Sequence, residues 1–485
     1  MSRTAAFNFT FAASSKSMKR PHPNSSSRNS GRLISWLEEL GATGLENITI
    51  REGEGGGLGV FAAKKIAPQS TIYQCPTSAV AITADNALND PIVGPPLRSL
   101  RSQMDKHEVV IVYLLYYWVN VGSTNNDPYV ADLIAQSDEL MASLPKFWPP
   151  KELELLGGTS SRVKLRAQGI YLREFHNRVV DKLTLEHPSI FPAAKFTIEA
   201  LQRAHATYWS RAITVPTTSR NKPQLAMTPL FDLFNHANCP SSSGNRVSIV
   251  EGDDTKYKMV SASGIEIGEE IFINYGSKGN EDLLRSFGFV LENNPVNVVE
   301  LDLRLSGECE WSEERLGLLE SAAQGVIPEN KWLRPVLFSG GGLPQKFLPA
   351  LRILCAKGEM ELAAAVNDAI ENGLDEGKRI DGEKKGGGED EFDWDKVDWA
   401  SGDPFFEANC QAENSPCGTE FERRTLRVAI SFLDKTLENL PTKILNGNGE
   451  FEKGSRSWMA SVYVEGERAL IHEARDMLLN LQEKL

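Results

Sequence analysis

The sequence predicts an α+β fold, in which a β-rich core carries a helical insert and is followed by an all-α C-terminal domain. Short apolar segments separated by turn residues occur at 48–82 and 226–290, which is typical of strands. Apolar residues recur at spacings of three and four from about 97 to 213 and again beyond about 305, which is typical of helices. The length of 485 residues fits two or three domains.

The strands are expected as short elements on both sides of the insert. The first group covers residues 48–51, 58–62, 71–74 and 79–82. In the second group, Ile271, Ile273 and Tyr275 alternate along the chain, so we expect them on one face of a strand.

The helices are expected to bury one apolar face each. In the insert, the face comprises Val109, Val112, Leu115, Tyr116 and Val119. A further helix is expected to start at Ser312, whose side chain can cap it. Two stripes in the C-terminal domain indicate helix packing faces rather than binding sites. They comprise Leu426, Ile430, Leu433, Leu437 and Leu440, and then Leu470, Ala474, Leu478 and Leu481.

Composition sets the expected boundaries. Residues 1–30 are rich in Ser and basic residues and are predicted to be a disordered head. The core domain is expected over 31–295, with its helical insert at about 90–215, and the helical domain over 300–485. A polar, acidic stretch at 371–399 is predicted to be a disordered loop within that domain.

The charge is unevenly distributed. The net charge is -13, and no Asp or Glu precedes Glu38, whereas six basic residues do, which leaves -19 for the rest of the chain. An acidic body argues against a nucleic-acid-binding protein and favours a basic protein partner. The basic, Ser-rich head is compatible with either a disordered tail or an organelle transit peptide.

The cysteines and the apolar runs exclude further classes. Six cysteines in 485 residues form no C-x-x-C pair, so neither a disulfide framework nor a zinc site is indicated. The longest apolar run, 109–119, has eleven residues, whereas a membrane-spanning helix needs about 20. We therefore expect no metal site, no membrane span and a reducing compartment.

Three motifs carry candidate chemistry. The segment 51–61 holds glycines at 55, 56, 57 and 59, and a strand is expected at 58–62, where a dinucleotide fingerprint requires a helix. Asn235 and His236 offer an amide and an imidazole behind an apolar stretch. Gly268-Glu-Glu-Ile-Phe-Ile-Asn-Tyr-Gly276 ends in a Tyr that can point into a cleft. Taken alone, the first two motifs favour a structural role, as a hairpin turn and a buried His, and the third is equally compatible with a core Tyr.

In this order, however, the three motifs resemble the SET-domain protein methyltransferases. The chain further resembles the branch typified by the Rubisco large-subunit lysine methyltransferase, which has a helical insert and a helical substrate-binding domain. The insert has segments similar to the landmarks of that branch. They are Asp127-Pro-Tyr129, Leu144-Pro145, Phe147-Trp148, Gly158-Thr159 and Ser210-Arg211-Ala212.

The resemblance implies S-adenosylmethionine as the cofactor and gives each motif a role. Gly57, Leu58 and Gly59 would offer backbone groups to its amino-acid end, and Arg211 would pair with its carboxylate. Asn235 and His236 would also bind the cofactor. The catalytic residue would be Tyr275, and the substrate channel would be lined by Ile213, Phe231, Phe287 and Phe289.

Two departures from the family pattern stand out. The family has Glu directly before the Gly-Leu-Gly turn, whereas this chain has Gly56 there and Glu54 two residues earlier. Relatives also place a second Tyr shortly after Asn-His, whereas residues 237–250 contain none. A SET-fold binding module without turnover is therefore an alternative.

Lysine is the expected target, and histidine is the second alternative. A histidine-methylating relative in this branch has Asn two residues after the Arg, where this chain has Ile213, and Trp in place of Phe231. Apolar side chains suit the methylene stem of a lysine. The expected partner is a basic, non-histone protein, such as a ribosomal or translational protein. The enzyme is expected to be a monomer. Its expected location is the cytoplasm or the nucleus, or an organelle if the head is a transit peptide.

Overall fold

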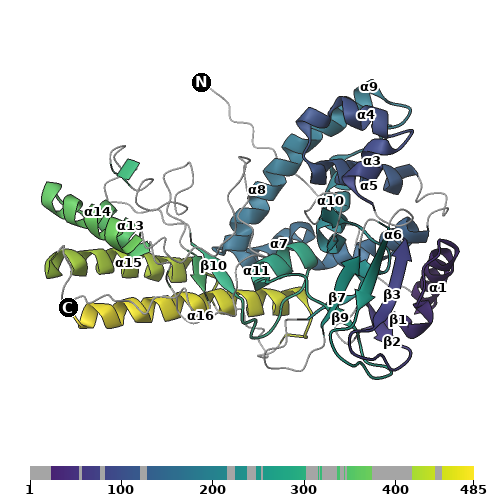
Figure 1. Cartoon of the computed structure of the whole chain (residues 1–485). Coiled ribbons are helices and arrows are strands. Elements are labelled where there is room, and N and C mark those ends of the chain that lie inside the picture. The colour runs from purple at the N-terminus through teal and green to yellow at the C-terminus, as the bar shows by residue number, and fades with distance from the viewer. Residues whose placement is uncertain are drawn as a thin grey trace.

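Figure 1 shows the computed structural model, in which the C-terminal helices extend from one side of a body formed by the preceding strands and helices. The structure describes residues 23–53, 57–76, 82–120, 128–215, 224–237, 247–252, 255–301, 347–373, 418–442 and 451–485, with short stretches between 315 and 343. The predicted α+β fold is confirmed.

The first strands form an antiparallel hairpin of β1 (Ile48–Glu52) and β2 (Leu58–Ala62), which follows the 3-10 helix η1 (Leu45–Asn47). The Gly53 N–H donates to the Gly57 carbonyl at 3.0 Å, and Gly57 has a φ of 73°. Glycine reaches this backbone region without steric cost, which is why it closes the turn.

Five strands form the main sheet, in the order β3–β8–β7–β9–β6. Their bounds are β3 (Thr71–Pro76), β6 (Asn235–His236), β7 (Val247–Gly252), β8 (Lys256–Val260) and β9 (Phe272–Ile273). The first three strands in this order are antiparallel, whereas β9 runs parallel to both β6 and β7. The Asn-His pair and the Phe272–Ile273 part of the Gly268–Gly276 motif therefore lie on adjacent strands. A separate antiparallel pair comprises β4 (Ile213–Val215) and β5 (Gln224–Ala226).

Between β3 and β4 the described chain is helical, as predicted for the insert. Its elements are α3 (Ala84–Asn89), α4 (Gly94–Ser99), η2 (Arg101–Gln103), α5 (Lys106–Asn120), α6 (Pro128–Ser143), η3 (Pro145–Phe147), α7 (Pro150–Leu153), η4 (Glu154–Leu156), α8 (Ser160–Phe175), η5 (His176–Val180), α9 (Asp181–Glu186) and α10 (Ile198–Arg211). Three of these helices begin at a threonine whose hydroxyl accepts from a backbone N–H of the first turn: Thr83, Thr159 and Thr197. Such a cap stabilises a helix by about 1 kcal/mol.

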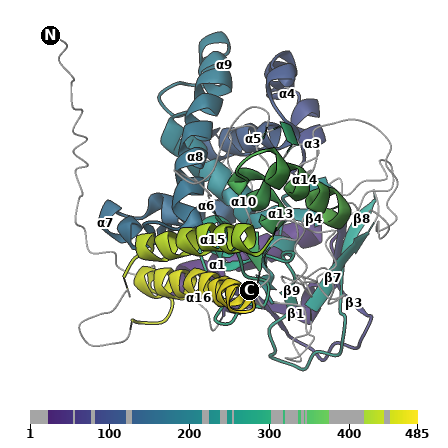
Figure 2. The same ribbon diagram turned by 90° about the vertical axis from the view of Figure 1, so that its left-hand side faces the viewer.

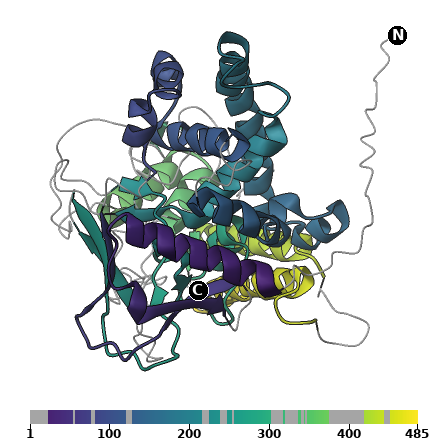
Figure 3. The same ribbon diagram turned by 90° about the vertical axis from the view of Figure 1, so that its right-hand side faces the viewer.

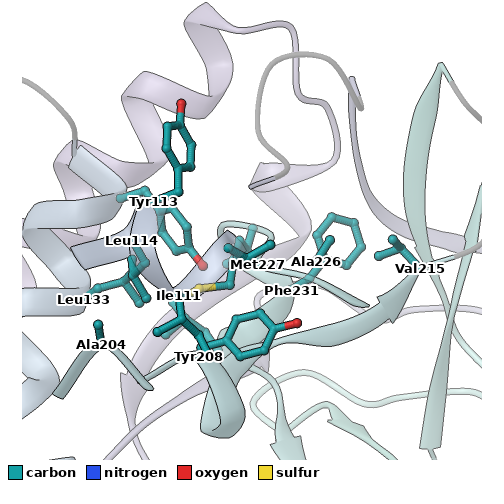
Figure 4. Packing of buried hydrophobic residues seen from close by; sticks show 14 of the residues in the cluster. Ile111, Tyr113, Leu114, Leu133, Ala204, Tyr208, Val215, Ala226, Met227 and Phe231 are labelled. Carbon is teal, nitrogen blue, oxygen red and sulfur yellow. The ribbon is translucent and has the colours of Figure 1, made fainter. Parts of the chain in front are cut away.

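The core lies where the insert meets the sheet. Helix α5 is buried along residues 108–115 and packs against α10, and both contact the residues that precede β6. Figure 4 shows this packing, with Ile111 and Leu114 on one side and Met227 and Phe231 on the other. Short elements then complete this part of the chain. They are η6 (Phe231–Leu233), α11 (Asn280–Asp282), η7 (Leu283–Phe287), β10 (Val298–Glu300) and β11 (Val336–Phe338).

The C-terminal helices pack through the predicted stripes. They are α13 (Phe347–Cys355), α14 (Glu359–Gly373), α15 (Thr419–Asn439) and α16 (Arg456–Glu483), and Figure 2 shows α15 and α16 side by side. Leu426, Leu433 and Leu478 are almost completely buried, which confirms the stripes as packing faces. Arg352 and Glu422 form a buried two-point ion pair between α13 and α15.

The first half of α16 does not belong to the C-terminal cluster. Met459, Tyr463 and Val464 pack with Trp148 and Leu156 of the insert in a separate apolar cluster. At the same place, Gly158 has a φ of 75°, and a Cβ there would overlap the Asn439 carbonyl at the end of α15. The insert and the C-terminal helices are therefore in direct contact across the predicted boundary near 300.

A buried acid lies in this joint. The Ser160 hydroxyl donates to Glu467 Oε1 at 2.7 Å, the Tyr463 hydroxyl donates to the same oxygen, and the Ser161 N–H donates to the Tyr463 oxygen at 3.2 Å. Burial raises the pKa of Glu467 to about 7, and the nearby Glu281 acts in the same direction, while the two hydroxyl donors oppose them.

Two predicted boundaries are wrong. The disordered head was expected to reach residue 30, but α1 begins at Pro23 and ends at Glu39. Figure 3 shows α1, in purple, lying across the body, and its Leu33 and Leu37 are completely buried, so this apolar pair anchors a helix that extends back into the Ser-rich segment. The acidic loop was expected from 371, but α14 continues to Gly373. Three of the predicted features lie outside the described residues: the head at 1–22, the loop at 374–399 and the helix start at Ser312. Of the expected strand at 79–82, only Ile82 is described, and it forms a β-bridge with Met227.

In the described part of the chain, no helix is both long enough and apolar enough to cross a membrane.

The buried acid predicts a pH-dependent stability. The folded protein holds the Glu467 proton up to pH about 7, whereas the unfolded chain releases it near pH ~4.3. Because the folded state then binds more protons, stability falls as pH rises from about 4 to about 7, by roughly 4 kcal/mol in total. Glu467→Gln keeps the acceptor oxygen but does not ionise. We therefore expect its gain in melting temperature over wild type to be larger at pH 8 than at pH 5.5.

The matched control is Glu473→Gln, since Glu473 is exposed on the same helix. Calorimetric scans of all three proteins at both pH values make the comparison. Equal differences between Glu467→Gln and wild type at the two pH values would contradict the assignment.

Candidate functional site

Asn235 joins three segments that are distant in the sequence. Its side-chain Nδ2 donates to Glu270 Oε1 at 2.7 Å and to the Leu58 carbonyl at 3.3 Å. Both neighbours can only accept, so the orientation of the amide is fixed. Oδ1 is left as an acceptor that has no partner among the described residues.

The glycines of the hairpin are needed for this arrangement. A Cβ on Gly59 would overlap Glu270 Oε1, and a Cβ on Gly53 would lie 3.3 Å from the same atom. The backbone of β2 therefore lies directly against the carboxylate and the Asn235 amide. This close approach explains the glycine at position 59, whereas Gly57 is explained by its positive φ.

His236 and Tyr275 form the next part of the site. The Tyr275 N–H donates to His236 Nδ1 at 3.1 Å, which makes Nδ1 the acceptor and assigns the ring proton of the neutral form to Nε2. The two rings stack with their centroids 5.1 Å apart. On its other side, Tyr275 stacks on Phe287 at 4.9 Å, and Phe289 lies 6.4 Å from Phe287.

The Tyr275 hydroxyl has a fixed direction. It donates to the Phe234 carbonyl at 2.8 Å, so its oxygen retains lone pairs for a further group. Burial raises the pKa of Tyr275 well above its ordinary value, and this outweighs the opposing effect of Arg211. The phenol is therefore neutral at physiological pH.

Arg211 stands at the end of α10 and is held by the protein. Its Nη1 donates to the Asp232 carbonyl at 3.2 Å and lies 3.7 Å from Asp232 Oδ2, while its Nη2 donates to Gln136 Oε1 at 2.6 Å. The resemblance to the SET-domain methyltransferases implies that this guanidinium pairs with the carboxylate of the cofactor. Two of its nitrogens instead bind groups of η6 and α6.

A buried acid network supports Arg211. The Tyr129 hydroxyl donates to Asp232 Oδ2 at 2.9 Å, and Gln136 Nε2 donates to Asp132 Oδ2 at 2.6 Å. Burial raises the pKa of Asp232 to about 6, although Arg211 and Tyr129 act against it. Asp232 Oδ1 is buried without a hydrogen-bond partner in the described structure. Gln136 thus bridges Asp132 and Arg211 by hydrogen bonds, and the position of Asp132 restrains that of the guanidinium.

The two apolar residues predicted for a substrate channel differ in their surroundings. Ile213 begins β4, pairs with Ala226, and is half-buried against the core. Phe231 is completely buried and packs on Tyr73 at 4.9 Å, as Figure 4 shows for its place in the core. Phe231 therefore exposes no surface to a ligand here, because η6 directs its ring inward.

Comparison with known proteins identifies the central part of the chain. A family model described as "SET domain" matches residues 57–276. The chain contains a SET domain. This segment begins at the hairpin glycines and ends directly after Tyr275, so it includes the Asn235 contacts and the His236 stack.

Solved structures share the fold over nearly the whole chain. "Structure of Rubisco LSMT bound to AdoMet" has a TM-score of 0.68 at 17% identity, covering 94% of this chain and 92% of that one. "Crystal structure of the SET domain of LSMT bound to MeLysine and AdoHcy" has a TM-score of 0.68 at 18% identity, covering 94% of this chain and 92% of that one.

Curated relatives match a smaller share. The actin-histidine N-methyltransferases of Homo sapiens and Rattus norvegicus are each 23% identical over 334 residues, which is 67% of this chain and 52% of the relative. The chain thus spans about half the length of these proteins.

The SET domain brings most of the predicted site residues together. Leu58, Gly59, Asn235, His236 and Tyr275 are linked by direct contacts, and the phenylalanines 287 and 289 extend the stack. In the described residues, no group of three His, Cys, Asp or Glu side chains is placed to bind a metal ion.

Four residues of the site were not predicted. They are Glu270, Asp232, Gln136 and Tyr129. Glu270 lies within the quoted motif Gly268–Gly276, and Asp232 lies three residues before Asn235. In both cases an acid next to an apolar run was a usable signal. Gln136 had no sequence signal, because its role depends on the packing of α6 against α10.

The Gly59–Glu270 contact predicts non-additive stability effects. Glu270→Ala leaves a donor of the Asn235 amide unpaired, which should cost about 1–3 kcal/mol of unfolding free energy. Gly59→Ala should cost a similar amount, because the new methyl group displaces the same carboxylate from Asn235. In the double variant the methyl group has no carboxylate to displace. We expect the double variant to be about as stable as Glu270→Ala alone.

Urea denaturation of the wild type and the three variants measures this coupling. Glu269→Ala is the control, since Glu269 is the exposed neighbour in the same motif. If the costs of the two single substitutions simply add, then the carboxylate does not occupy the space below Gly59.

Proposed function

We propose that this protein is an S-adenosylmethionine-dependent methyltransferase whose acceptor is a lysine side chain of another protein. The observation that carries the proposal is the neutral Tyr275 hydroxyl, which donates to the Phe234 carbonyl while the ring stacks between His236 and Phe287. The SET-domain match and the LSMT structures support it.

The residues fit the proposed cofactor. An ammonium group needs acceptors and a close approach, and Asn235 Oδ1 and the glycine backbone of β2 offer both. The carboxylate of the cofactor would pair with Arg211. In this arrangement Nη1 keeps its hydrogen bond to the Asp232 carbonyl, and Nη2 exchanges Gln136 Oε1 for the carboxylate. When bound, the cofactor supplies an activated methyl group on a sulfonium centre. The missing Glu at position 56 is not required by this arrangement.

The acceptor amine must lose its proton before it can react. A lysine has an ordinary pKa of about 10.4, so deprotonation at pH 7 costs roughly 4–5 kcal/mol. Desolvation against the rings of Tyr275, Phe287 and Phe289 lowers this cost. The Tyr275 hydroxyl proton is donated to the Phe234 carbonyl, so the Tyr275 oxygen can accept an N–H of the neutral amine. This hydrogen bond directs the lone pair of the amine nitrogen away from Tyr275. Tyr275 therefore orients the amine and does not act as the base.

Two observations bear on lysine versus histidine. Ile213 at the start of β4 presents an apolar, half-buried side chain that suits a methylene stem and offers no hydrogen bond to an imidazole. The curated relatives, by contrast, are actin-histidine methyltransferases. Histidine is therefore the second candidate, and acid hydrolysis of labelled protein followed by amino-acid analysis separates methyl-lysine from methylhistidine.

The partner is proposed to be a basic, non-histone protein, such as a ribosomal or translational protein, in the cytoplasm or nucleus. The chain carries a net charge of -13, which favours encounter with basic proteins. Activity should then fall as salt rises above about 0.15 M, where charges are screened beyond about 8 Å.

Cofactor binding gives one test of the proposed function. Wild type should bind S-adenosylmethionine in a calorimetric titration, and Asn235→Ala should bind it more weakly by about 1–3 kcal/mol, because a polar partner of the ligand is lost. Asn274→Ala is the control, since Asn274 is an exposed asparagine of the same domain. Absence of cofactor binding to wild type would end the proposal.

Turnover gives another test. Tyr275→Phe keeps the ring stack but removes the oxygen that orients the amine, so kcat should fall on the order of 100-fold. The cofactor Kd should stay within a factor of about two, because the hydroxyl contacts the acceptor. Radiolabelled methyl transfer to proteins of a cell extract measures kcat. An unchanged kcat would remove Tyr275 from the reacting centre.

A further inference from the structure

Helix α8 exposes an unusual share of apolar surface. Eight large apolar side chains are exposed in the described part of the chain, and three of them lie on α8: Val163 at 49%, Ile170 at 52% and Tyr171 at 37%. The opposite face of α8 is buried through Leu165 and Leu172. Exposed apolar side chains that gather on one element indicate an interaction surface.

The exposed residues form a line along the helix. Val163, Ala167 and Ile170 follow at spacings of four and three, so they lie on the same side of α8. A line of this spacing is the packing face of an amphipathic helix. No described element covers it, because all three residues are exposed.

A row of positive charge borders this line. Arg162, Arg166 and Arg173 lie beside the apolar residues on the helix, and none forms an ion pair with a described residue. Other basic residues nearby are paired: Lys164 contacts Glu281 and Glu300, and Arg178 contacts Glu108. In a chain of net charge -13, three unpaired arginines on one helix face are a local exception.

The helix is held rigidly where this surface begins. Thr159 caps α8, and Ser160 donates to the buried Glu467 of α16. Figures 1 and 2 show α8 on the side of the insert that is turned toward the C-terminal helices. A protein that contacts the C-terminal helices can therefore reach α8 as well.

We propose that the face of α8 formed by Arg162, Val163, Arg166, Ile170 and Arg173 binds an acidic, amphipathic segment of the protein that is methylated. The inference rests on the proposed function, since it takes the acceptor protein as the partner: that protein is basic overall and presents one local acidic segment to α8. Apolar residues of the segment pack on Val163 and Ile170, and its carboxylates pair with the arginine fork.

The chemistry favours a protein segment over two other anionic partners. A nucleic acid is bound through phosphates and stacked bases, for which aliphatic side chains at the centre of the site are of no use. A membrane-binding helix has a long apolar face, whereas this line has three residues. An acidic protein segment uses both parts of the surface.

The test uses a defined probe and the whole protein without cofactor. The probe is a fluorescein-labelled, 16-residue helical peptide with Leu at positions spaced by three and four and Glu beside them. Fluorescence anisotropy should show binding that weakens as salt is raised. The double variants Arg166→Glu with Arg173→Glu, and Val163→Ser with Ile170→Ser, should each weaken binding at least 10-fold. Lys435→Glu, an exposed charge change on α15, should leave it unchanged.

The same variants are then assayed for methyl transfer to extract proteins. We expect KM for protein acceptors to rise at least 5-fold while the cofactor Kd is unchanged. Peptide binding does not depend on turnover, so this inference alone is overturned if the wild-type enzyme transfers methyl groups but does not bind the peptide, or if the double variants bind the peptide as tightly as wild type. Tighter binding of phosphatidylserine vesicles or of single-stranded oligonucleotide than of the peptide, abolished by the arginine variants, would also overturn it. A peptide with Lys in place of Glu that binds equally well would do the same.

Discussion

The site depends on the side-chain amide of Asn235. This one group connects the hairpin through Leu58, the strand-end acid Glu270, and its own strand β6. A carboxylate and a carbonyl fix its orientation, so its free oxygen acquires a defined direction before any ligand arrives. The same strand pairing places His236 and Tyr275 next to each other. The parallel strands β6 and β9 bring the Asn-His pair and the motif that ends in Tyr275 to the same edge of the sheet.

A second constraint is the balance of buried charge. Asp232, Asp132 and Glu467 are all acids whose burial raises their pKa, and each is held by hydroxyl or amide donors. Arg211 connects two of these acids through Asp232 and Gln136. Such networks are costly to leave half-satisfied, and they therefore favour a single arrangement of η6, α6 and α10. The geometry around Tyr275 rests on that arrangement.

The sequence predicted the classes of structure well and the individual contacts unevenly. Alternation at Ile271 and Ile273 and the leucine stripes of α15 and α16 were sufficient, because periodicity reports which face is buried. Periodicity could not predict the burial of Phe231, because this residue lies in a single 3-10 turn, which is too short to show a periodic pattern. The guanidinium partners of Arg211 come from elements 21 and 75 residues away, and such pairings arise only from tertiary packing. The start of α1 was missed because Leu33 and Leu37 impose a helix on a serine-rich segment.

The cluster that unites Trp148, Leu156 and Met459 has a consequence for biosynthesis. The insert leaves the ribosome some three hundred residues before the part of α16 that covers it. Until the first half of α16 has been synthesised, the side of the insert that packs on Met459 has no partner, and the nascent protein is exposed to aggregation and to chaperones. Cotranslational folding of the segment that precedes α16 therefore cannot bury this cluster, and α16 completes the packing of the insert.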